Sequence, residues 1–116
     1  PGLQVTRATI RRLFNVDVSG VEDLRVIRDV CRLVRRRAAQ ISATVCSAPL
    51  LKTQTQGRAT VAIDGSVFEK TPSFRRVLQE SMHTILGPEC DVTTVLAKDG
   101  SGIGAAFISA MVVNDK

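Results

Sequence analysis

A chain of 116 residues is long enough for one compact domain and too short for two ordinary ones. Its 44% hydrophobic and 23% charged residues are typical of a globular protein, and its longest apolar run, Ile103 to Val113, falls short of the roughly 20 residues that a membrane-spanning helix needs, so we expect no membrane as a partner. The net charge of +5 comes from the N-terminal part, because residues 1–37 hold nine arginines and four acidic residues, whereas the later charges cancel.

Two helices are predicted in the N-terminal half, within residues 6–48. The first covers about Thr6 to Phe14 and is followed by a break from Asn15 to Gly20. Ser19 and Glu22 have the spacing of a capping box, so a long helix should begin there and end at Pro49. Apolar residues at steps of three and four predict its buried face: Leu24, Ile27, Cys31, Val34, Ala38, Ile41 and Val45.

Residues 58–113 predict the order strand, helix, strand, helix. The strands are Arg58 to Ile63 and Val92 to Ala97, and the last helix is Ala105 to Val113. Between the strands, Thr71-Pro72 is a helix start and Gly87-Pro88 a helix stop. The apolar face of the helix between them is Phe74, Val77, Leu78, Ser81, Met82, Ile85 and Leu86. Two strands joined in this way imply a right-handed parallel crossover and hence an α/β unit.

A turn with glycine follows each predicted strand. Asp64-Gly65-Ser66 follows the first strand, and Lys98 to Gly104, with three glycines, follows the second. Glycine lets a ligand approach the backbone closely, and α/β sheets bind ligands at the carboxyl ends of their strands. We therefore predict that both turns face one edge and form a nucleotide site. For the second turn alone, a purely structural joint between strand and helix is an equally good interpretation.

These segments resemble a known family. Val61 to Phe68, Pro72-Ser73-Phe74 and Asp99 to Ala106 closely resemble the C-terminal end of the large domain of hexokinases, and the resemblance runs from about Thr9 to Val113. Arg37-Ala38-Ala39 resembles the helix that precedes the first of these strands in that family. Two further stretches look most like the trypanosomatid branch, namely Thr53 to Thr60 and Glu69 to Pro72.

The resemblance implies an actin-like ATPase (ribonuclease H-like) fold, ATP and magnesium as cofactors, and transfer of the γ-phosphoryl group of ATP to the 6-hydroxyl of glucose or a related hexose. By position, the first turn would border the phosphates and ribose, and the second the adenosine. The residues so assigned to the nucleotide are Gly65, Ser66, Val67, Phe68, Gly100, Ser101 and Gly102. Ser66 offers a hydroxyl to a phosphate oxygen, whereas Glu69 stands where many relatives carry lysine.

No catalytic residue and no metal ligand is assigned to this segment. The catalytic aspartate, the sugar-binding segments and the first phosphate loop of the family lie upstream of the region represented here. We therefore expect the segment alone to be inactive. As part of its parent chain it would help to hold ATP or ADP, while the missing part of the enzyme binds the hexose. Asp64 receives no catalytic role because aspartate commonly braces turns, and His83 has no acidic or cysteine partner at a useful spacing.

The cysteines predict a reduced compartment. Cys31, Cys46 and Cys90 are odd in number and widely spaced, so we expect buried thiols rather than a disulfide framework or a metal site. Together with the resemblance, this indicates a cytoplasmic or glycosomal location. A homo-oligomer stays open.

Other functions are weighed against this interpretation. Gly100 to Ala105 also fits the G-x-G-x-x-A spacing of dinucleotide-binding proteins, but the acidic ribose contact expected about 20 residues later would fall beyond Lys116. A Walker loop is excluded because Ala105-Ala106 replaces Lys-Ser or Lys-Thr. The N-terminal arginines leave open a basic interaction or nucleic-acid-binding module, although nucleic acid is not expected without tryptophan or tyrosine for base stacking. A non-catalytic hexokinase-like scaffold is also compatible with the sequence.

Overall fold

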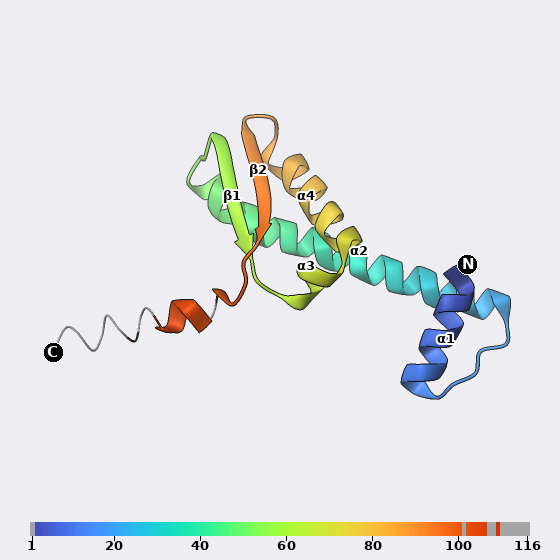
Figure 1. Cartoon of the computed structure of the whole chain (residues 1–116). Helices are drawn as coiled ribbons and strands as arrows, with labels where there is room; N and C mark the ends of the chain where they lie inside the picture. Colours follow the sequence, from blue (N-terminus) through green and yellow to red (C-terminus); the bar gives the residue numbers. More distant parts are fainter. Residues whose placement is uncertain (1, 101, 107–108, 110–116) are drawn as a thin grey trace. The chain divides into compact units, whose positions relative to one another are not determined.

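The computed structural model describes residues 2–100, 102–106 and 109 (Figure 1). Its elements follow in the order α1 (Gly2–Phe14), α2 (Val21–Lys52), β1 (Gly57–Ile63), α3 (Ser66–Lys70), α4 (Pro72–Leu86) and β2 (Cys90–Leu96). Residues 1–38 form one compact unit and residues 39–116 a second, so the two parts of α2 belong to different units. Of the predicted last helix, residues 105, 106 and 109 are described and are helical; its other residues lie outside the described residues. Residues 100 and 102–104, which precede it, are helical as well.

The loop before α2 is fixed by an arginine of α1. Arg7 donates hydrogen bonds of 3.0 Å to the carbonyl oxygens of Val18 and Ser19. The first helical hydrogen bond of α2 runs from the Leu24 nitrogen to the Gly20 oxygen, at 3.2 Å. The helix therefore begins one residue later than a cap at Ser19 requires, and Glu22 binds Arg25 at 2.7 Å instead of completing the predicted capping box.

The buried face of α2 differs from the predicted one. Leu24 is buried and Ile27 half-buried as predicted, but the remaining large apolar residues of the predicted face are exposed, Ile41 by 54% and Val45 by 68%. The second unit buries Ala39, Ala43 and Ser47 of this helix instead, each completely. These small side chains form the contact because they let the helix come close to the elements that it packs against. The prediction gave too much weight to side-chain size.

Pro49 does not end α2, which continues to Lys52. Proline removes its own N–H bond and crowds the carbonyl four residues earlier, but its own carbonyl remains an acceptor, through which the helix continues. The nitrogen and the hydroxyl of Thr53 both donate to the Pro49 oxygen, at 3.0 and 2.9 Å. The helix therefore ends at Lys52, three residues beyond the predicted end.

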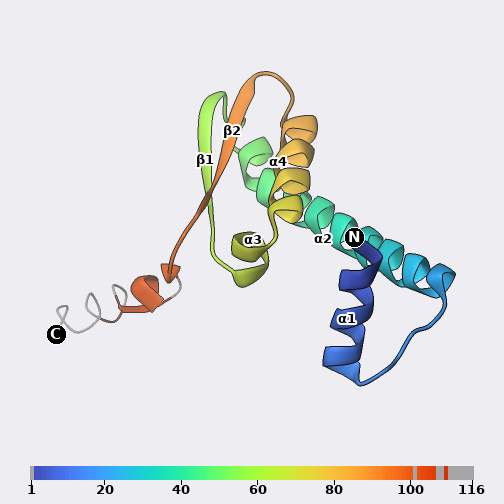
Figure 2. The same ribbon diagram turned by 45° about the vertical axis from the view of Figure 1, so that its right-hand side comes forward.

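The two strands pair in parallel, as predicted, from Gly57 opposite Cys90 to Ile63 opposite Leu96. Alternate residues of both strands are buried or half-buried in one core with α2 and α4, and Figure 2 shows both helices on the same side of the strands. The predicted apolar face of α4 is confirmed, since it contributes Phe74, Leu78 and Met82 to this core. Thr71 precedes α4 as predicted, but its backbone oxygen and not its hydroxyl accepts the first bonds of the helix.

Gln79 of α4 caps the outer edge of β2, which the sequence did not predict. Its side-chain nitrogen donates to the Val92 oxygen, and its side-chain oxygen accepts from the Thr94 nitrogen at 3.0 Å and from the Thr94 hydroxyl at 2.7 Å. The Thr94 N–H has a single hydrogen, so it cannot also bond to β1. The amide group of Gln79 therefore takes the place that a neighbouring strand would occupy.

The hydroxyl of Ser47 is buried without a hydrogen-bond partner among the described residues. A buried, unpaired hydroxyl costs about 1–3 kcal/mol of stability. Because Ala39 and Ala43 already line the same face, we expect Ser47→Ala to raise the free energy of unfolding by about 1 kcal/mol in urea titrations. The control is Ser42→Ala, at a half-buried position, where a change within about 0.5 kcal/mol is expected. A destabilised Ser47→Ala variant would contradict this assignment.

Candidate functional site

The two turns lie at the same edge of the sheet. Beyond the last strand pair, the Ala97 nitrogen donates to the Ile63 oxygen at 3.0 Å, so the chains leave the sheet side by side. There they enclose a pocket of about 240 Å³, here called the rim pocket. Its lining residues are Asp64, Gly65, Ser66, Glu69, Leu96, Ala97, Lys98 and Asp99. Gly100 is also close to the first turn, since a Cβ atom there would lie 3.9 Å from an Asp64 carboxylate oxygen.

Gly65 exposes its backbone to the rim pocket. Its φ and ψ angles are both 143°, a conformation essentially reserved for glycine, and a Cβ atom built there would have no heavy atom within 4 Å. The chain then turns directly into α3, which begins at Ser66. A ligand can therefore reach the main chain at this turn without meeting a side chain at Gly65.

The second turn is shaped by Asp99. This residue has a φ angle of 56°, and its carbonyl accepts a 3.0 Å bond from the Ile103 nitrogen. A Cβ atom on Gly102 would lie only 2.8 Å from the Asp99 carboxylate. Gly102 thus has a local structural reason to be glycine, because it leaves room for the Asp99 side chain. Ser101, which was assigned to the nucleotide with Gly100 and Gly102, lies outside the described residues.

The lining of the rim pocket is predominantly acidic. It carries the carboxylates of Asp64, Glu69 and Asp99 against the single ammonium group of Lys98. The hydroxyl of Ser66 adds a neutral hydrogen-bond donor. Such a lining favours hydroxyl and amino groups of a ligand, and it accommodates an anion best when a cation comes with it.

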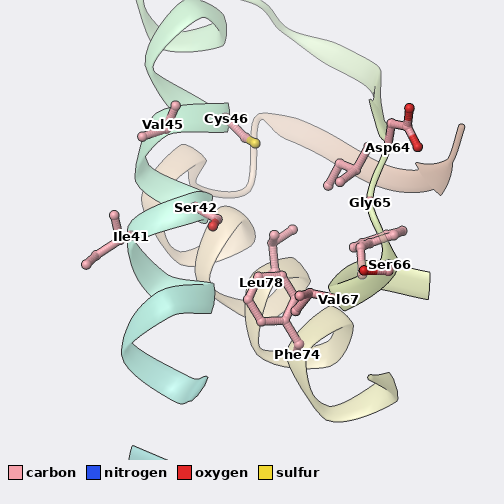
Figure 3. Close-up of a pocket in the computed structure, with 12 residues that line it drawn as sticks. Ile41, Ser42, Val45, Cys46, Asp64, Gly65, Ser66, Val67, Phe74 and Leu78 are labelled. Carbon is pink, nitrogen blue, oxygen red and sulfur yellow. The ribbon is translucent and has the colours of Figure 1, made fainter. Parts of the chain in front are cut away.

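A larger, mostly apolar cavity of about 550 Å³ adjoins the rim pocket at the first turn, where Asp64, Gly65 and Ser66 line both (Figure 3). Val67 and Phe68 line this cavity and not the rim pocket, and Phe68 is only 2% exposed. Of the four residues of the first turn that were assigned to the nucleotide, only Gly65 and Ser66 line the rim pocket. The wall opposite the turn comes from α2 and includes Ile41, Val45 and Cys46 (Figure 3).

Comparisons with known proteins show the family of the chain. A family model described as "Hexokinase" matches residues 1–111. The chain belongs to the hexokinase family. It is 44% identical over 114 residues to Hexokinase HKDC1 of Homo sapiens, 33% over 119 residues to Hexokinase-1 of Spinacia oleracea, and 31% over 118 residues to Hexokinase-2 of Oryza sativa subsp. japonica.

These alignments cover 94–95% of this chain but only 12% of the human protein and 24% of each plant protein. The chain therefore spans a quarter or less of the length of these hexokinases. Both turns of the rim pocket fall inside the matched range, residues 1–111.

His83 of this hexokinase segment lines neither the rim pocket nor the apolar cavity. His83 is exposed, and its Nε2 atom is 2.9 Å from the side-chain nitrogen of Gln79. Among the residues that the structure describes, no three His, Cys, Asp or Glu side chains are placed to hold a metal ion together. Within the same described part, no helix is long and apolar enough to cross a bilayer.

Of the cysteines, Cys90 is buried and Cys46 half-buried, but Cys31 is exposed, so the prediction of buried thiols is wrong for Cys31.

The arginines of the first unit are partly paired. Asp29 binds Arg28 at 3.0 Å and Arg32 at 3.6 Å, and the hydrogen bond from Arg28 lowers the pKa of Asp29 below its usual value. Within the described residues, the remaining exposed arginines of this unit are in no ion pair; they are Arg11, Arg12, Arg35, Arg36 and Arg37. The positive charge predicted from the sequence is therefore accessible at the surface of this unit.

Proposed function

We propose that this segment forms part of the ATP site of a hexokinase, which transfers the γ-phosphoryl group of ATP to the 6-hydroxyl of glucose or a related hexose. Membership of the family supports the reaction. The observation that carries the location of the site is the convergence of Asp64-Gly65-Ser66 and Lys98-Asp99 on one pocket at the carboxyl ends of two parallel strands.

The residues of the rim pocket fit a nucleotide. Gly65 leaves its main chain open to the ligand, the Ser66 hydroxyl can donate to a phosphate oxygen, and Lys98 can balance phosphate charge. The carboxylates of Glu69 and Asp99 can accept hydrogen bonds from ribose hydroxyls. We keep Gly100 and Gly102 in the proposed site because Gly100 is close to Asp64 and Gly102 is close to Asp99. Ser101 is kept only because it lies between them in the sequence.

Magnesium fits as a companion of the nucleotide. The rim pocket has more carboxylates than cations, so bare phosphates would be repelled, and Mg²⁺ bound to ATP would neutralise them. The described residues offer no three-ligand metal site, which supports delivery of the ion on the phosphates. Asp64 would face this ion across the pocket as a source of negative charge.

We further propose that the segment has no activity alone. Phosphoryl transfer needs a positioned base and an aligned acceptor hydroxyl, and the proposed roles of the rim pocket supply neither. In this view residues 58–113 are the nucleotide-binding unit of an actin-like ATPase fold, and the preceding helices belong to the same large domain. The hexose would be bound by the rest of the enzyme.

We also propose a branch of the family and a cellular location for the protein. The resemblance of residues 53–60 and 69–72 favours the trypanosomatid branch and, with it, a glycosomal location. The relatives named above, by contrast, come from a mammal and from plants. A cytoplasmic location and a homo-oligomer are equally compatible with the segment.

A second candidate function is a basic interaction module, alone or within a non-catalytic hexokinase-like scaffold. It is supported by the exposed arginines of the first unit that lack an acidic partner among the described residues. Binding to arbitrary DNA with a steep salt dependence would favour it. Nucleotide binding that is independent of these arginines would favour the hexokinase site.

Calorimetric titration with MgADP tests the proposed function. We expect the wild-type segment to bind MgADP and Ser66→Ala to bind it about tenfold more weakly, because a hydrogen bond to a charged group is lost. Ser73→Ala is the control, since Ser73 of α4 lines neither the rim pocket nor the apolar cavity and should leave the affinity unchanged. Equal affinities of Ser66→Ala and the wild type would contradict the assignment of this turn, and absence of binding by the wild type would refute the site.

A further inference from the structure

Arg75 of α4 contacts the short helix α3 in two ways. Its Nη2 atom lies 3.4 Å from the carbonyl oxygens of both Phe68 and Glu69. Its guanidinium carbon lies 4.9 Å from the centre of the Phe68 ring, which is a cation–π contact. One side chain therefore binds the carbonyl end of α3 and covers its aromatic residue at the same time.

These contacts matter because α3 cannot hold its own position. A helix of five residues is far too short to be stable in isolation. Gly65, immediately before it, is the residue type with the greatest backbone freedom. The position of α3 thus depends on Phe68 in the core and on Arg75 above it. Ser66 and Glu69, which line the rim pocket, belong to this helix and move with it.

Arg75 itself lines neither the rim pocket nor the apolar cavity, so any effect on a ligand has to pass through α3. We propose that Arg75 is a positioning residue, which fixes α3 so that Ser66 and Glu69 are correctly placed for the nucleotide. This inference rests on the proposed function. A guanidinium group suits this position better than an ammonium group, because its planar face stacks on the Phe68 ring while an N–H group at its edge donates to the carbonyls of α3.

Arg76 provides a matched control on the same helix. Its side chain is 74% exposed and forms only a 3.8 Å ion pair with Glu80, one turn further along α4. Arg75→Gln and Arg76→Gln change the net charge equally. They differ in whether the contact with α3 is lost.

The test combines MgADP titration with amide hydrogen exchange of the whole chain. We expect Arg75→Gln to speed exchange in residues 66–70 but not in β2, and to weaken MgADP binding about threefold. Arg75→Lys should restore part of the affinity, and Arg76→Gln should match the wild type in both measurements. Adenosine, which would rest on the second turn, should bind to Arg75→Gln as well as to the wild type.

The results separate this inference from the function on which it rests. If the wild type and Ser66→Ala behave as expected but Arg75→Gln binds MgADP normally, the positioning role is refuted and the nucleotide site stands. Equal losses of MgADP and adenosine affinity in Arg75→Gln would also refute it, because they indicate general damage to the fold. If the wild type binds no MgADP, both proposals fail.

Discussion

The Gly65→Ala variant is expected to bind MgADP more than about tenfold more weakly than the wild type, a larger loss of affinity than that of Ser66→Ala. With φ and ψ both at 143°, residue 65 has a conformation that alanine avoids at a cost of about 1–3 kcal/mol. The turn relieves this strain only by rotating, and rotation moves Ser66 away from the pocket. The added methyl group also enters the open space through which a ligand reaches the main chain.

Gly57→Ala is the matched control for this experiment. Gly57 also has a positive φ angle, 74°, and open space at its Cβ position, but it lies at the opposite end of β1. Both variants should lose stability in a thermal melt, and only Gly65→Ala should lose affinity in the MgADP titration. Equal loss of affinity in the two variants would show that backbone strain weakens MgADP binding by destabilising the whole fold and not by a local change at the rim pocket.

The Phe68→Ala variant is expected to lose about 3–5 kcal/mol of unfolding free energy, the largest change in stability that we predict. Phe68 is 2% exposed in the core with Leu78 and Met82, so truncation leaves a cavity under α3. Because small domains have only about 5–15 kcal/mol in total, the loss is a substantial part of the stability of the second unit. Urea unfolding followed by circular dichroism measures it.

Phe14→Ala is the control, because Phe14 is 70% exposed and its truncation should cost less than about 0.5 kcal/mol. Phe68→Leu, which keeps most of the buried volume, should fall between Phe68→Ala and the wild type and remains measurable if Phe68→Ala does not fold. A cost below about 1 kcal/mol for Phe68→Ala would contradict the burial described here.

The rim of the site could be predicted from the sequence because it depends on topology. A helical crossover between neighbouring strands is typical of a parallel pair, and parallel strands end at one edge, so the turns after Ile63 and Leu96 were expected to meet. The boundaries of α4 could be predicted for a similar reason, since Thr71-Pro72 and Gly87 act locally on the chain. Such signals need no knowledge of the tertiary contacts.

The features that were predicted wrongly or missed depend on tertiary contacts. Periodicity identified α2 as a helix, but several faces of it carry apolar residues, and only packing selects Ala39 and Ala43 over Ile41 and Val45. The helix α3 was missed because five residues show no period. Its formation divides the first turn, with Ser66 at the rim pocket and Phe68 in the core, although both had been assigned to the nucleotide.

The amide of Gln79 on the margin of β2 has a consequence for how this protein behaves when it is concentrated or partly unfolded. An unprotected β margin recruits other chains, which can start fibrils and precipitates. Here the Val92 carbonyl and the Thr94 N–H are already occupied once α4 has formed. Between chains with an intact α4, assembly through these groups is therefore blocked, and melting of that one helix opens the route to polymerisation.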